Sequence, residues 1–228
     1  MFPLFWDWTI ILLIPALLFG LFAQYRVSST FNRFSKVRSG RGLTGAQGAR
    51  MLLDSAGLGF VSVESAPGRL SDHYDPRSKV LRLSRDVAES DSLAALGVAA
   101  HEAGHAIQDA EGYAPMKLRS TLVPVANIGS NFGFILFFVG LIMGRVPLLM
   151  NLGIVLFSAA VLFTIVTLPV EINASRRALR QLSARGILVS TEVDGARKVL
   201  SAAALTYVAA ALMAILNLVR LILISRER

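Results

Sequence analysis

Four stretches of this chain each approach the roughly 20 apolar residues that a helix needs to cross the hydrocarbon core of a bilayer. A backbone inside a bilayer must satisfy its own hydrogen bonds, so each stretch is expected to be helical. The hydrophobic content of 54% agrees with this, because soluble domains contain roughly 45 to 50% apolar residues. The sequence therefore predicts a mainly α, multi-pass membrane protein with about four transmembrane helices. The stretches run from about Phe5 to Ala23, Val123 to Met143, Val146 to Val170 and about Ala202 to Ile224.

The first stretch could be a cleaved signal peptide or a permanent membrane anchor. A signal peptide begins with a positively charged region. Residues Met1 to Trp8 instead contain Asp7 and no Lys or Arg. We therefore expect a permanent anchor, with Trp6 and Trp8 at the membrane interface, where tryptophan is enriched.

The distribution of basic residues predicts which parts of the chain face the cytoplasm. Of the 23 Lys and Arg residues, 13 lie in residues 25–122 and 6 in residues 171–200. Cytoplasmic loops are rich in Lys and Arg, so both segments are expected in the cytoplasm, with both termini and the turn at Arg145 outside. The arginines at the C-terminus leave open that the last stretch stops short of crossing.

The net charge of +8 does not indicate nucleic-acid binding, because no basic stripe is interleaved with aromatic residues. Anionic lipid head groups are the expected partners of the basic segments. The Gly-rich stretch from Ser39 to Gly48 lacks the Lys-Ser/Thr ending of a phosphate-binding loop, so no nucleotide site is expected.

Residues 26–92 are the mixed, water-soluble part of the sequence. Thr44 and Gln47 form a capping-box pattern that starts a helix, and Gly57 can end it. Residues 60–63 and 80–83 have the pattern of short strands, with turns at Pro67-Gly68 and Asp75-Pro76.

A second helix is expected after these strands, capped by Ser90, Asp91 or Ser92 and running to about Asp109. The sequence thus predicts a small α+β catalytic domain within a membrane protein. The expected segments are an anchor (1–24), a cytoplasmic α+β segment (25–122), a transmembrane hairpin (123–170), a segment with a third metal ligand (171–201) and a C-terminal transmembrane helix (202–228).

The second helix contains the chemistry, in the sequence His101-Glu102-Ala103-Gly104-His105. Two histidines four apart project from one face of a helix and can hold one metal ion, and Glu102 beside them can reach a metal-bound water. Because the chain has no cysteine, any metal must be held by His, Asp or Glu. The alternative is a buried helix with two hydrogen-bonded histidines, but an unpaired Glu would be costly to bury there.

A catalytic zinc site needs a third protein ligand. Glu171 is the main candidate, because it follows directly on the third apolar stretch. It could instead be an interfacial carboxylate paired with Arg176 or Arg177. His73 is the competing ligand, although a solvated loop residue is its expected role.

Three segments of the sequence resemble the YugP-type neutral zinc metallopeptidases of bacterial membranes, which are similar to the HtpX and CAAX prenyl protease group. They are SDHYDPRSKVLRLS, HEAGHAIQDAEGYAPMKLRSTLVPVANIGSN and TLPVEINASRRALR. The likeness covers nearly the whole chain, with its segments in the same order. It implies a zincin-like fold, one Zn²⁺ held by His101, His105 and Glu171, and Glu102 as the catalytic base. It also implies that residues 80–84 form an edge strand along which a peptide substrate pairs.

This chain departs from the HtpX pattern after Glu171. That group usually has an Asp four residues after the ligand Glu, where this chain has Ser175. Asn173, Ser175 or Asp109 could replace that Asp in orienting a ligand histidine. Tyr207 in the last apolar stretch could serve packing or donate a hydrogen bond to an oxyanion.

The sequence therefore predicts a membrane-embedded, zinc-dependent endopeptidase that hydrolyses membrane or membrane-proximal polypeptides through a Glu-activated, zinc-bound water. The alternative is a zinc-binding or chaperone-like membrane scaffold without proteolysis. Structural zinc sites usually have four protein ligands, mostly including Cys, which favours catalysis here. A metal transporter is not expected, because the apolar stretches lack acidic or basic residues apart from Asp7 at the start of the first stretch and Arg220 in the last.

Overall fold

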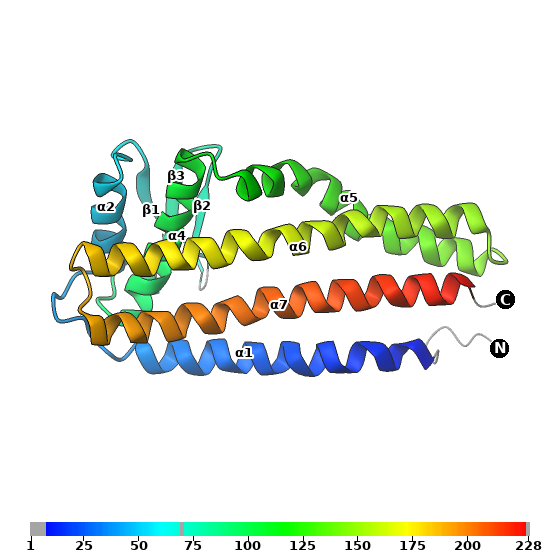
Figure 1. Cartoon of the computed structure of the whole chain (residues 1–228), viewed down its shortest axis with the longest axis horizontal. Coiled ribbons are helices and arrows are strands. Elements are labelled where there is room, and N and C mark those ends of the chain that lie inside the picture. The colour runs from blue at the N-terminus through cyan, green and yellow to red at the C-terminus, as the bar shows by residue number, and fades with distance from the viewer. Residues whose placement is uncertain (1–7, 69–70, 227–228) are drawn as a thin grey trace. The chain divides into compact units, whose positions relative to one another are not determined.

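The computed structural model describes residues 8–68 and 71–226. Within these ranges, four helices are long and apolar enough to cross a membrane, which confirms the predicted class (Figure 1). Trp8 begins the first of them, whereas Trp6 lies outside the described residues. The helices are α1 (Ile14–Phe34, preceded by a 3-10 turn, Trp8–Leu13), α5 (Ala114–Ile142), α6 (Pro147–Ala184) and α7 (Ser190–Arg226).

Helix α6 is much longer than its apolar stretch. Its 38 residues span about 57 Å at ~1.5 Å per residue, against about 30 Å of hydrocarbon. The helix continues through Pro169 into the polar sequence that begins at Glu171. The candidate ligand Glu171 therefore stands on a continuous helix and not on a loop.

The chain divides into two compact units. We call Met1–Ala23, Lys117–Pro169 and Thr206–Arg228 the membrane unit, and Gln24–Met116 and Val170–Leu205 the HExxH unit. This division rests on contacts within each unit, so the five functional segments expected from the sequence remain a prediction.

In the membrane unit, small residues bring α5 and α6 close together. A Cβ on Gly129 would lie 2.2 Å from the carbonyl oxygen of Leu156, and one on Gly153 would lie 2.7 Å from that of Gly133. Lipid tails are as apolar as the side chains of these helices, so the hydrophobic effect does not drive the helices together. Close packing of the backbones is instead a main source of helix association in membranes. The two helices form a tightly packed hairpin. Its buried side chains, with two from α7, are Phe137, Met150, Phe157, Val161, Leu221 and Ile224.

The HExxH unit contains a three-stranded sheet with the order β1-β3-β2. Strand β1 (Ser62–Ala66) pairs parallel with β3 (Val80–Ser84), and β2 (His73–Asp75) pairs antiparallel with the other side of β3. Two predictions are corrected here. Residues 80–84 form the central strand and not an edge, and His73 lies in a strand and not in a loop.

The first strand also begins later than predicted, at Ser62 and not at residue 60. The guanidinium of Arg50 donates to the carbonyl oxygens of Leu58 and Val61, which holds the preceding segment as a turn. Phe60 is 68% exposed in this turn. Its apolar side chain therefore gave a misleading strand signal.

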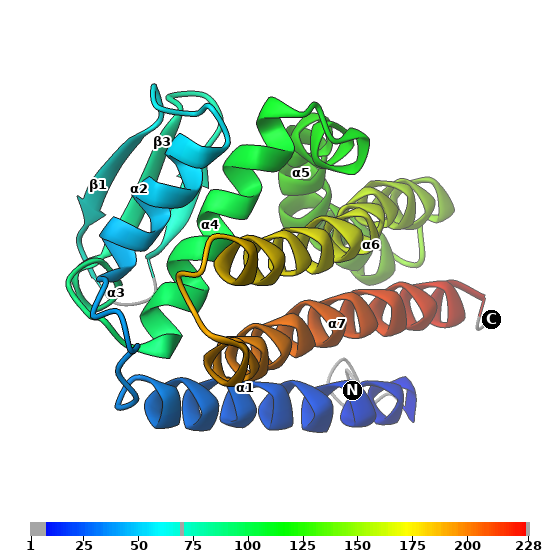
Figure 2. The same cartoon turned by 60° about the vertical axis from the view of Figure 1, so that its left-hand side comes forward.

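Two helices lie side by side along one face of the sheet (Figure 2). Helix α2 (Gly45–Ser55) starts with the predicted capping box of Thr44 and Gln47. Helix α4 (Leu93–Ala110) starts at Ser92, whose side chain accepts from the backbone N–H of Ala95. A short helix, α3 (Arg85–Ala88), was not expected. Most of α4 is buried, so polar side chains on it need partners within the protein.

Candidate metal centre

The two histidines of α4 project from one face of the helix, as their spacing predicts. The centroids of the rings of His101 and His105 lie 4.7 Å apart, with the rings nearly perpendicular. His105 is 8% exposed, and the side chain of His101 is 13% exposed. The pair therefore lies in a largely buried part of the HExxH unit.

Glycine between the histidines lets the polar end of α6 approach them. A Cβ on Gly104 would lie 2.7 Å from the carbonyl oxygen of Ala174, closer than real Cβ contacts. This contact brings Glu171, one turn before Ala174, against the histidine pair. Glu171 Oε2 lies 3.1 Å from Nε2 of His101 and 3.5 Å from Nε2 of His105.

The distances from the Glu171 carboxylate to the two histidines fit a zinc ion. Ligand atoms at ~2.0 to 2.1 Å from a tetrahedral zinc are about 3.3 Å apart, between the two distances observed here. Glu171 is only 2% exposed. A cation held by all three groups would compensate the buried carboxylate. His101, His105 and Glu171 thus form a group that could hold one metal ion.

Each histidine has a hydrogen-bond partner at its other ring nitrogen. Nδ1 of His101 lies 3.0 Å from Oγ of Ser175, and Nδ1 of His105 lies 3.0 Å from Oε1 of Gln108. These bonds leave both Nε2 atoms directed at Glu171. Of the three substitutes for the missing Asp, Ser175 is the one that contacts a histidine of the pair.

Gln108 was missed by the sequence analysis. Its position three residues after His105 on the same helix could have indicated it, because residues three apart are neighbours on a helix surface. Asn173 contacts Gln108 and Arg177, not a histidine.

The carboxylate of Glu102 lies outside the group of three donors. It is 9% exposed, and its Oε2 accepts a hydrogen bond of 3.0 Å from the backbone N–H of Tyr74 on β2. This bond ties the outer edge of β2 to α4. The carboxylate beside the histidine pair is thereby held in place by the sheet.

The hydroxyl of Tyr74 makes a second tie between β2 and α4. It donates to Oδ2 of Asp109 at 2.7 Å, and Nζ of Lys79 donates to the same oxygen. Burial raises the pKa of Tyr74, and its hydrogen bond to the Asp109 carboxylate raises it further. The phenol therefore stays protonated and keeps this bond well into the alkaline range.

The electrostatics around His105 favour a positive charge on this residue. Burial lowers the pKa of His105, but hydrogen bonding and charge interaction with Glu171 and the charge of Glu102 outweigh it, so the pKa lies above its ordinary value. Two buried carboxylates beside two imidazoles suit a divalent cation.

Two further residues from the sequence analysis lie outside this arrangement. His73 is an exposed residue of β2, and its Nδ1 lies 2.7 Å from the carbonyl oxygen of Ser71. Tyr207 belongs to the part of α7 in the membrane unit, and its role remains a prediction.

Comparison with known proteins agrees with this geometry. A family model described as "Putative neutral zinc metallopeptidase" matches residues 9–226. The chain is 47% identical to a Bacillus subtilis protein named "Putative membrane protease YugP", over 94% of this chain and 95% of that protein. No solved structure matches. The match to nearly the whole chain and the group of His101, His105 and Glu171 lead to one conclusion: the chain belongs to this family of neutral zinc metallopeptidases.

Proposed function

We propose that this protein is a membrane-embedded zinc endopeptidase, with His101, His105 and Glu171 as the metal ligands and Glu102 as the general base. The observation that supports it most directly is the convergence of two histidines and Glu171, whose Oε2 lies at zinc spacing from both imidazoles, beside the second carboxylate of Glu102. When bound, zinc lowers the pKa of a coordinated water to about 7 and polarises a carbonyl group.

The protein's own groups would then move the proton. As water adds to the peptide carbonyl carbon, a carboxylate oxygen of Glu102 takes up the proton that the water loses. Glu102 returns this proton to the nitrogen as the C–N bond breaks, so that a carboxylic acid and an amine leave. The bond from the Tyr74 N–H holds the carboxylate where it can act.

The substrate strand would pair with β2. This strand has one neighbour in the sheet, β3, so its other side is the edge that an extended peptide can join. The N–H of Tyr74 points from this side toward Glu102. A peptide along β2 therefore passes close to the base, and this replaces the expectation that residues 80–84 receive the substrate.

The site is proposed to face the cytoplasm and to act on membrane or membrane-proximal polypeptides. Its ligands lie in the two segments that contain 19 of the 23 basic residues. Glu171 also follows directly on an apolar stretch, which places it near the membrane surface.

The test is the Glu102→Gln variant of the full-length protein, assayed for zinc content and for cleavage of an unfolded model protein. We expect zinc to be retained and the rate to fall by about 10² to 10⁴, because a general base contributes that much. Glu89→Gln removes an exposed carboxylate that pairs with Arg85 and is the control. Cleavage at the parent rate by Glu102→Gln would refute its role, and zinc binding without cleavage by the parent would favour the scaffold alternative.

A further inference from the structure

The amide of Gln108 can adopt one orientation beside His105. Gln108 is completely buried, and its Nε2 donates to the carbonyl oxygen of Val170 and to Oδ1 of Asn173, both at 2.9 Å. Turning the amide over would place its oxygen against two acceptors. Oε1 of Gln108 must therefore face Nδ1 of His105, which makes Nδ1 the protonated nitrogen and leaves Nε2 with its lone pair.

The orientation of Asn173 is fixed in turn by an arginine. Nε of Arg177 donates to Oδ1 of Asn173 at 2.6 Å, so Asn173 must present its oxygen and not its amide nitrogen. The same guanidinium donates through NH1 to Oε2 of Glu111 at 2.6 Å. Arg177 thus fixes the amide orientation of Asn173, and Asn173 helps to fix the amide orientation of Gln108.

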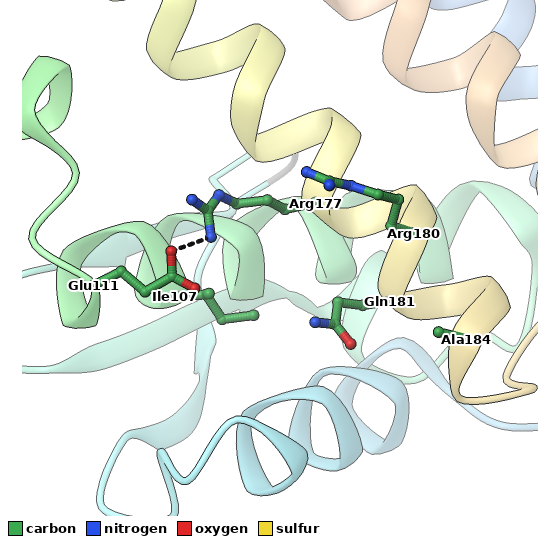
Figure 3. A pocket seen from close by; sticks show the side chains of 6 residues that line it. All are labelled: Ile107, Glu111, Arg177, Arg180, Gln181 and Ala184. Carbon is green, nitrogen blue, oxygen red and sulfur yellow. Dashed lines mark hydrogen bonds and ion pairs between the residues drawn. The ribbon is translucent and has the colours of Figure 1, made fainter.

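Arg177, the outermost residue of these contacts, lies at a surface pocket of about 270 Å³ between α4 and α6 (Figure 3). Arg177 and Arg180 both line this pocket. In the figure Arg177 reaches across it to Glu111, whereas Arg180 stays beside its own helix. Nε of Arg180 donates to the carbonyl oxygen of Arg176, one turn earlier in α6.

We propose that Gln108, Asn173 and Arg177 form a positioning chain that fixes the tautomer and ring direction of His105. The proposal rests on the proposed function, since it takes His105 as a metal ligand. Loss of Arg177 lets Asn173 turn over, which removes one of the two acceptors of Gln108 Nε2 and leaves only the carbonyl oxygen of Val170. The orientation of Gln108 is then less firmly held, and in a fraction of the molecules its NH₂ turns toward His105. In that fraction Nδ1 of His105 becomes an acceptor, Nε2 takes the proton, and the lone pair needed by the metal is lost.

The test is the zinc affinity of the full chain, measured by competition with a chromogenic chelator. Removing the partner of a ligand histidine typically weakens metal binding 10- to 100-fold, so Gln108→Leu is expected in that range. Arg177→Gln should weaken binding about tenfold, at the low end of the same range.

Arg180→Gln is the matched control, because it removes a positive charge from the same pocket, and Arg180 does not belong to the positioning chain. Its zinc affinity should stay within about twofold of the parent, well below the effect of a lost orienting partner. The double variant Gln108→Leu/Arg177→Gln should bind zinc no more weakly than Gln108→Leu alone, because residues that act through one contact are not additive. Equal effects of Arg177→Gln and Arg180→Gln, or parental affinity in Gln108→Leu, would overturn the proposal.

Asn173 gives a second comparison should Arg177→Gln fail to fold. Asn173→Asp accepts from both neighbours and should keep the affinity, whereas Asn173→Leu, of similar size, should lose it. Thermal unfolding of each zinc-free variant separates loss of fold from loss of metal. If the folded parent binds no zinc, the proposed function fails; if the parent binds zinc and these pairs do not differ, the positioning chain alone fails.

Discussion

Replacing Gly104 with Ala tests whether the approach of α6 to α4 sets the metal centre. The added Cβ would stand 2.7 Å from the carbonyl oxygen of Ala174, and ordinary contact begins at 3.4 Å. Because a carbonyl oxygen of a helix backbone cannot turn aside, α6 must shift by about 0.7 Å, the difference between these two distances.

The cost to the fold is expected to be modest. Overpacking costs about 1 to 3 kcal/mol, whereas Ala in place of Gly within a helix returns roughly 0.5 to 1 kcal/mol. The net destabilisation is therefore about 2.5 kcal/mol or less, which is small enough for the protein to fold.

The cost to the site is larger, because Glu171 moves with α6. A misplacement of about 1 Å can lower a catalytic rate about 100-fold, so a shift of this size should lower the rate about 10- to 100-fold. Zinc affinity and cleavage of an unfolded protein are the assays. Gly97→Ala, on the same helix, is the control, because its Cβ would meet Ala196 at 3.4 Å without a clash. Parental zinc affinity and rate in Gly104→Ala would refute the reasoning.

Two further predictions concern the third ligand and the topology. Glu171→Ala should bind zinc more weakly by orders of magnitude, because Glu171 contacts both histidines. His73→Ala should keep the metal, because His73 is exposed. Metal analysis of the purified variants tests this, and the reverse result would rule out Glu171 as the third ligand. Cysteines placed at Ser55 and Ser190 in this cysteine-free chain should both resist an impermeant thiol reagent added to intact cells, because both segments are basic. Labelling of either cysteine from outside would contradict the cytoplasmic placement.

Local rules predicted the parts of the site that lie on single helices. The spacing of His101 and His105 dictates a shared face, and the capping pattern at Thr44 starts α2 where expected. Glu171 could be singled out because the hairpin of two apolar stretches had to return the chain to the same side of the membrane. The structure brings this residue together with the histidine pair.

The order of the strands could not be predicted, because it depends on pairing between distant segments. Strand β2 has three residues, too few to show an alternating pattern, so His73 looked like a loop residue. The edge position of residues 80–84 was implied by the family resemblance, and without β2 nothing in the sequence contradicted it.

The contacts that orient the histidines were also hidden from the sequence. Gln108 contacts Asn173, 65 positions away, and the pairing of Ser175 with His101 spans 74 positions. Each depends on how α4 and α6 are rotated about their axes, which the contact of Gly104 with Ala174 fixes. Sequence spacing describes one helix at a time and does not contain this rotation.

The α5–α6 hairpin also separates the proposed ligands in time. The ribosome makes His101 and His105 before the hairpin and Glu171 after it, with 65 residues between His105 and Glu171. A growing chain therefore has an incomplete ligand set until both spans have been inserted and the end of α6 has emerged on the starting side. On the proposed ligand set, peptidase activity begins only when membrane insertion of the hairpin is complete. A chain arrested before that point would remain inactive toward its neighbours.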